Sequence, residues 1–345
     1  MAGTRDARGR VAALAGRRTR AGWGEVVVWL AAVAAVWLLP GRHLVLTEIA
    51  ILALFAVSLD LILGYAGIVS LGHAAFFGVG AYIAGLLAKH GTGEPLIGLA
   101  AAMAGAALLG LLTSVLVLRG SDLTRLMVTL GVALVLGEVA NQAAAFTGGA
   151  DGLQGIAVGP VLGVFDFDLF GTTGYVYSLS VLFVLFVAAR ILVGSPFGLS
   201  LTGIRDNPLR AASVGVPVNA RLVAIYTVAA AYAGAAGALA AQSTSFVSLD
   251  VFDLNRSADV LLAVVIGGSG YLYGGMLGAV IFKVLQDVLS GLTPQYWHFW
   301  IGFLLVLLVL VRRERIAGMA RRWSSAAVAG IRGRTVSAPG ISGDA

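Results

Sequence analysis

The sequence predicts an all-α fold, a polytopic transmembrane helix bundle of about ten spans with glycine-broken helices. Three observations predict it. Of the 345 residues, 59% are hydrophobic and 12% charged, and the mean hydropathy is +0.94, well above that of a soluble domain. Apolar stretches of about 20 residues, long enough to cross a bilayer as helices, recur along the chain. Basic residues gather at both ends. Lipid is therefore the main solvent, which excludes a separate soluble domain and argues against a nucleic-acid partner.

Charged residues and clusters of glycine or proline divide the apolar sequence into individual spans. We expect these spans near residues 26–39, 44–63, 73–88, 96–118, 126–146, 175–193, 222–242, 258–267, 275–290 and 297–311. An even number of spans places both ends of the chain on the same side of the membrane. Long segments at 147–173 and 243–256 then lie together on the opposite side.

The arginines indicate which side holds the ends, because cytoplasmic loops carry an excess of Lys and Arg. We predict a basic, disordered cytoplasmic arm over 1–22, a transmembrane domain over 23–315 and a basic, disordered cytoplasmic tail over 316–345. The same threading leaves four basic residues away from the cytoplasm: Arg42, Lys89, Arg256 and Lys283.

Glycine clusters interrupt two of the apolar stretches, at residues 64–72 (the first glycine break) and 267–275 (the second glycine break). One break lies in each half of the chain, which suggests an internal repeat. Non-helical backbone at membrane depth must be buried in protein or line a wet cavity, and in transporters it often lies on the solute path. The alternative is close helix packing, for which Gly274 and Gly278 have the right spacing.

Polar side chains inside the spans are further candidates for a solute path, because lipid tolerates ionisable groups only when they are paired or hydrated. Glu138 is followed at helical spacings by Asn141 and Gln142, and Thr129 lies in the same span. Such acceptors suit an ammonium group or the N–H groups of urea. An interhelical hydrogen bond is the alternative.

The other path candidates flank the two breaks: Tyr65, Ser70, His73, Gly267 and Gly268. For His73, a hydrogen bond to a neighbouring backbone carbonyl is the alternative role. We expect Asp60, near the inner end of its span, to reach the membrane interface rather than a solute.

A hydrophilic segment, SPFGLSLTGIRDNPLRAASVG at 195–215, follows the sixth span and is too polar to cross the membrane. Proline in the first turn and Gly215 beyond the end predict a short helix over 208–214. A helix presented this way suits a cleft on a soluble partner. An ordinary solvated loop is the alternative.

Four stretches resemble the LivM-type permeases of branched-chain amino acid ABC transporters. They are GYAGIVSLGHAAFFGVGAY at 64–82, TGGADGLQGI at 147–156, the 195–215 segment, and LLAVVIGGSGYLYGGMLGA at 261–279. Their order and spacing make the resemblance specific, whereas a single glycine-rich stretch is not. The chain departs from the family at Pro208 and Ala212, where relatives usually carry a glutamate in this helix.

The resemblance implies an importer of branched-chain or related amino acids in the bacterial inner membrane. Residues 195–221 (the 195–221 loop) would then couple to the motor through Arg205, Asp206, Asn207, Arg210, Ala211, Ala212 and Gly215. The implied partners are a second homologous permease, two cytoplasmic ATP-binding subunits and an extracytoplasmic solute-binding protein. The chain has no GxxxxGK[ST] sequence, so we expect ATP and Mg on the partners and no cofactor or metal here.

Three alternatives stay open at this point. Permeases for urea or short amides look similar to this family. A secondary transporter without an ATPase also uses broken helices. An intramembrane serine protease would need Ser269 of the GGSG sequence as nucleophile and His298 as base.

Overall fold

The computed structural model describes residues 23–91, 93–168, 171–292, 294–296 and 299–303, and the predicted arm 1–22 and tail 316–345 lie outside these ranges. Two compact units divide the chain, Met1–Val284 and Leu285–Ala345. The described residues are helical apart from loops and two isolated β-bridges. The predicted all-α class is therefore confirmed for this part of the chain.

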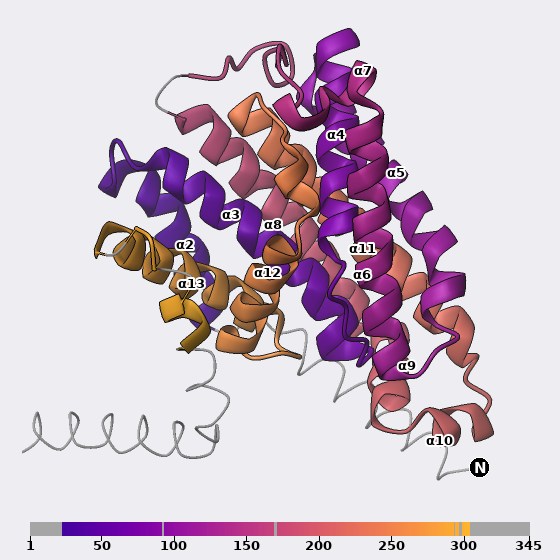
Figure 1. Cartoon of the computed structure of the whole chain (residues 1–345). Coiled ribbons are helices and arrows are strands. Elements are labelled where there is room, and N and C mark those ends of the chain that lie inside the picture. The colour runs from indigo at the N-terminus through magenta and orange to yellow at the C-terminus, as the bar shows by residue number, and fades with distance from the viewer. Residues whose placement is uncertain (1–22, 92, 169–170, 293, 297–298, 304–345) are drawn as a thin grey trace, which may run out of the picture. The chain divides into compact units, whose positions relative to one another are not determined.

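The helices follow one another in chain order (Figure 1). They are α2 (Trp23–Leu38), α3 (His43–Asp60), the π-helix η1 (Leu61–Tyr65), α4 (Ala74–His90), α5 (Pro95–Val117), α6 (Asp122–Gln142), α7 (Ala144–Thr147), η2 (Gly149–Asp151), α8 (Thr172–Gly194), α9 (Pro196–Asp206), α10 (Pro208–Ser213), α11 (Val218–Thr244), η3 (Leu249–Phe252), α12 (Leu254–Gly267) and α13 (Leu272–Leu292).

Six helices of the described part are long and apolar enough to cross a membrane. They are His43–Tyr65, Pro95–Val117, Asp122–Gln142, Thr172–Gly194, Val218–Thr244 and Leu272–Leu292. The predicted spans 26–39 and 73–88 correspond to shorter apolar helices. The predicted span 258–267 belongs to α12, whose 14 residues reach about 21 Å, less than the bilayer core. Most of the span predicted at 297–311 lies outside the described residues.

The core of the first unit is built around α11, which packs against α3, α4 and α5. Small residues make this possible, because most of the alanines and glycines along α11 are buried. A Cβ added at Gly237 would clash with the carbonyl of Phe77 in α4. Without a strong hydrophobic force between helices in lipid, such close backbone contact supplies much of the packing energy.

Loops at one end of the first unit join across the chain. The 147–156 segment pairs with the segment after α11 through Leu153 and Val247, whose backbone N–H groups donate to each other's carbonyls at 2.7 and 3.3 Å. Figure 1 shows α7 at this end and α10 at the opposite end. The two long segments predicted to share a side of the membrane therefore meet.

Two of the basic residues that the predicted threading left away from the cytoplasm have partners within the bundle. Lys283 in α13 forms an ion pair with Glu48 in α3. The guanidinium of Arg256 lies 5.7 Å from the centre of the Phe77 ring, where a cation is attracted to the aromatic face.

Candidate functional site at the paired glycine breaks

The first glycine break begins where α3 turns into the π-helix η1, a local widening that often marks functional sites. Residues 66–73 are not helical, and Gly67 has a φ of +73°. Side chains from elsewhere replace the missing helical hydrogen bonds. The N–H of Leu71 donates to Thr129 Oγ1 in α6 at 3.3 Å, and the N–H of Ala74 donates to Ser257 Oγ in α12 at 3.0 Å.

The second glycine break is shorter. Helix α12 ends at Gly267 and α13 begins at Leu272, with Gly268 and Gly270 at φ values of +98° and +84°. The later glycines of the cluster lie inside α13, where a Cβ at Gly278 would clash with the Ala263 carbonyl of α12. The packing role considered for Gly274 and Gly278 is therefore confirmed for both, since a Cβ at Gly274 would similarly clash with Gly268.

The two breaks meet in the fold. The N–H of Gly270 donates to Asp60 Oδ1 at 2.7 Å, and a Cβ at Gly64 would clash with that same nitrogen. Asp60 is fully buried, and its Oδ2 has no hydrogen-bond partner among the described residues. The prediction that Asp60 reaches the interface is wrong, because its carboxylate is used to hold the second break against the first.

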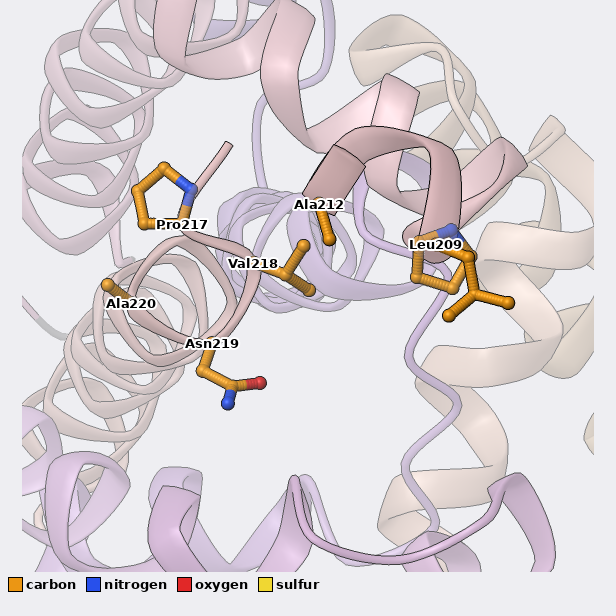
Figure 2. A pocket seen from close by; sticks show the side chains of 7 residues that line it. Leu209, Ala212, Pro217, Val218, Asn219 and Ala220 are labelled. Carbon is orange, nitrogen blue, oxygen red and sulfur yellow. The ribbon is translucent and has the colours of Figure 1, made fainter. Parts of the chain in front are cut away.

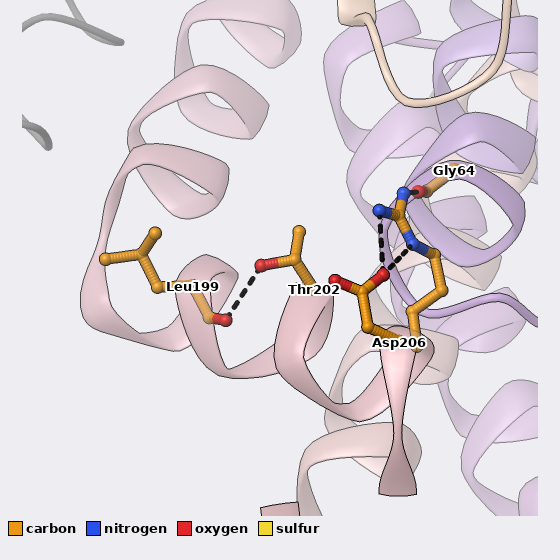
Figure 3. Close-up of polar contacts among 5 residues, drawn as sticks. Gly64, Leu199, Thr202 and Asp206 are labelled. Carbon is orange, nitrogen blue, oxygen red and sulfur yellow. Dashed lines mark hydrogen bonds and ion pairs between the residues drawn. The ribbon is translucent and has the colours of Figure 1, made fainter.

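Arg205, near the end of α9, joins the 195–221 loop to this junction. Its Nη1 donates to the carbonyl of Gly64, while Nε and Nη2 donate to Asp206 Oδ1, both at 3.2 Å (Figure 3). The aliphatic stem lies over Gly67, where a Cβ would come within 2.8 Å of Arg205 Cγ. Arg205 therefore connects the 195–221 loop directly to the first glycine break. Because Asp60 holds the second break against the first, the connection extends to the second break.

The predicted short helix of the loop is present as α10. Asn207 caps it, with Oδ1 accepting from the Arg210 N–H at 2.9 Å, and Gly215 follows at a φ of +86°. Ala211 is buried, whereas Leu209 is 82% and Val214 75% exposed. These two apolar side chains were not among the candidates from sequence.

A groove of about 480 Å³ separates α10 from the start of α11 (Figure 2). Its lining is almost entirely apolar: Pro208, Leu209, Ala212, Pro217, Val218, Asn219 and Ala220. Pro208 and Ala212 belong to this lining. An apolar groove on an exposed loop is the kind of surface that a partner protein covers.

A larger cavity, of about 830 Å³, lies beside the junction. Both breaks contribute to its wall through Tyr65, Ser269 and Gly270, and Arg205 contributes from α9. Glu25 of α2 and Arg190 of α8 form an ion pair on the same wall. We call this space the Glu25–Arg190 cavity.

The residues predicted for a solute path separate into groups. Tyr65 lines the cavity, and Gly267 and Gly268 form the start of the second break. Ser70 and His73 are buried, and His73 Nε2 shares a 2.8 Å hydrogen bond with Ser58 Oγ rather than with a backbone carbonyl.

The α6 candidates lie away from this cavity. Thr129 is buried against the first break, whereas Glu138 is exposed and accepts from Gln142 Nε2 at 2.6 Å. Asn141 is half-buried. Glu138 and Gln142 therefore share a face of α6, whereas Thr129 faces the bundle, and none of the α6 candidates lines the cavity.

Sequence reasoning missed the polar partners Ser257, Glu25 and Arg190. One signal in the sequence could have located part of this arrangement. Asp60 lies four residues before Gly64, the start of the first glycine break, at a spacing that places both on one side of a helix. For the protease alternative, Ser269 is exposed at the cavity wall, and His298 lies outside the described residues.

Comparison with known families gives a match over most of the chain. The family described as "Branched-chain amino acid transport system / permease component" matches residues 41–310. No solved structure matches the chain.

Individual relatives are also permease proteins of transport systems. The high-affinity branched-chain amino acid transport system permease protein LivM of Salmonella typhimurium is 31% identical, covering 78% of this chain and 68% of that protein. LivM of Escherichia coli is 29% identical over the same shares. The ribose import permease protein RbsC of Haemophilus influenzae is 26% identical, covering 61% of this chain and 66% of that protein.

Proposed function

The chain belongs to the family of permease components of branched-chain amino acid transport systems, and from this premise we propose how it works. It is a multi-pass membrane protein, the permease component of an ABC transport system, and not itself an ATPase. As partners we propose a second homologous permease, two cytoplasmic subunits that bind ATP and Mg, and an extracytoplasmic solute-binding protein. The membrane is a bacterial inner membrane.

For the topology, we propose ten membrane-entering segments with both ends in the cytoplasm. Arginine-rich ends and the basic residues of the 195–221 loop support this orientation through the positive-inside bias. The position of α10 opposite the paired 147–156 segment agrees with it. The loop is then available to cytoplasmic ATP-binding subunits.

The contact between Arg205 and the Gly64 carbonyl is the observation that carries the proposed mechanism. ATP-driven closure of the partner subunits would displace α10 and α9, and Arg205 would transmit this displacement to the first break. The Asp60–Gly270 hydrogen bond would pass it to the second break. Glycines at positive φ can absorb such a rotation of the backbone with little strain.

For the outer face of α6, we propose that the second permease covers it and that Glu138 faces the solute path there. Helix α6 exposes large apolar side chains, among them Leu134, Val135 and Val139, next to the exposed Glu138. A carboxylate that faces lipid is costly. A polar or hydrated surface is therefore a more favourable neighbour for Glu138 than lipid, which supports a solute path beside this residue.

Reconstitution tests the proposal directly. The chain is placed in proteoliposomes with the second permease, the ATP-binding subunits and the solute-binding protein, and leucine uptake is measured with and without ATP. We expect uptake to require ATP and the solute-binding protein. Leucine accumulation by the purified chain on an ion gradient, with no ATP-binding subunit present, would contradict the proposal, as would uptake of urea in place of leucine.

A further inference from the structure

The Glu25–Arg190 cavity holds two opposite charges that water reaches only partly. The side chains of Arg190 and Glu25 are 19% and 11% exposed. Removing both charges from water costs more than a surface pair does, and a pair of this kind contributes little net stability. Its position on the wall of a cavity suggests a role other than stabilisation.

The rest of the wall is amphipathic. Val28, Val193, Leu272 and Leu277 provide apolar surface, while the buried Tyr273 hydroxyl lies beside the Glu25 and Arg190 side chains. A space of about 830 Å³ is within the range of small-molecule sites, roughly 300–1,000 Å³. One charged pair beside apolar surface matches a small molecule that has both charges and an aliphatic chain.

We propose that this cavity binds a zwitterionic aliphatic amino acid on the inner side of the two breaks. Glu25 would take the ammonium group and Arg190 the carboxylate, while the aliphatic side chain lies against Val28 and Leu277. The zwitterion replaces one ion pair by two, so no uncompensated charge is created in the cavity. Uncharged urea offers neither charge.

The location gives this site its place in transport. Arg205 belongs to both the wall and the junction, so the same residue touches the cavity and the first break. Gly194, the last residue of α8, and Thr202, within α9, line the cavity. Figure 1 shows α9 at the end where α10 lies. The site rests on the proposed function and defines its last step, in which the amino acid pauses before release.

Photolabelling of the assembled complex tests the site. A diazirine analogue of leucine is supplied without the solute-binding protein, and labelled peptides are identified by mass spectrometry. We expect labels on peptides containing Val28, Val193 or Leu277, which excess leucine removes and excess urea does not. Labels only elsewhere, or labels displaced by phosphatidylglycerol and not by leucine, would overturn the assignment in favour of no site or of a lipid site.

Charge variants separate binding from structure. Glu25→Gln should lower the labelling at least tenfold, and the exchange Glu25→Arg with Arg190→Glu, which keeps both charges in the cavity, should recover part of it. Glu48→Gln, which removes the other interhelical pair with Lys283, is the matched control and should label like the natural chain. Full labelling of Glu25→Gln would show that the ion pair has only a structural role and defeat the proposal.

The outcomes distinguish this inference from the proposed function. If the wild-type complex imports leucine on ATP but the cavity stays unlabelled, the inference fails and the proposed function stands. If import does not depend on ATP at all, the proposed function fails first.

Discussion

In α11, Gly237 lies within an unbroken helix, whereas Gly67 and Gly270 lie where helices stop. In α11, the absent side chain lets α4 approach, and the backbone stays hydrogen-bonded within the helix. At the breaks, the backbone leaves the helix, and Thr129, Ser257, Asp60 and Arg205 supply hydrogen bonds from other elements. Both regions contain buried glycine, so the polar partners are what distinguish a packing contact from a movable junction.

The largest effect should come from the packing region. Gly237→Ala places a methyl group against the Phe77 carbonyl, and overpacking of this kind costs about 1–3 kcal/mol or more because backbone must move. We expect a lower melting temperature and a lower recovery of folded protein, as measured by fluorescence-detected size-exclusion chromatography after heating. Gly131→Ala in α6, where a Cβ meets nothing within 4 Å, is the control and should behave like the natural chain.

At the junction, Asp60→Ala should be the next most damaging change. It leaves the Gly270 N–H without its acceptor, at a cost of about 1–3 kcal/mol for a buried group. Asp60→Asn keeps an acceptor oxygen in place and should lie closer to the natural chain in both melting temperature and ATP-dependent uptake. Equal damage from the two substitutions would refute the hydrogen-bond role given to Asp60.

Ser257→Ala should have a smaller effect than Asp60→Ala. The substitution removes the acceptor of the Ala74 N–H at the start of α4, and losses of this kind cost about 0.5–2 kcal/mol. Thermal melting of the purified protein measures the change, and Ser257→Thr, which keeps a hydroxyl, should recover part of it. If Ser257→Ala does not lower the melting temperature, or if Ser257→Thr recovers none of the loss, the hydrogen-bonding role given to Ser257 is wrong.

The smallest effect on stability should come from the 195–221 loop. Leu209 is 82% exposed, so Leu209→Ser should change the free energy of unfolding by less than about 0.5 kcal/mol. The same change should reduce the recovery of ATP-binding subunits on co-purification several-fold. Ser213→Ala, a change on the same helix, is the control. Unchanged recovery with Leu209→Ser would place the partner elsewhere.

Local patterns in the sequence predicted much of this arrangement. Glycine and proline act on the backbone close to their own position. They therefore predicted the breaks at 64–72 and 267–275, the short helix that begins at Pro208 and its end before Gly215. Arg205 could be singled out through the family resemblance.

The partners of the breaks could not be predicted in the same way. Asp60 and Gly270 are 210 residues apart, Ala74 and Ser257 are 183 apart, and Glu25 and Arg190 are 165 apart. No periodicity links residues at such separations, and the segments meet only because α12 packs against α3 and α4, and α8 against α2 and α3. The length of α12 is a related case, because apolar composition alone does not separate a helix that crosses the membrane from one that only enters it.

The number of leucine molecules imported per ATP hydrolysed, in the reconstituted complex carrying Arg205→Ala, tests the central claim most directly. If Arg205 links the 195–221 loop to the breaks, ATP hydrolysis should continue while this ratio falls at least tenfold, and Arg205→Lys should recover part of it. Arg221→Ala removes a guanidinium of the same loop that lies over Phe197, and should keep the ratio of the natural chain. An unchanged ratio in Arg205→Ala would contradict the account.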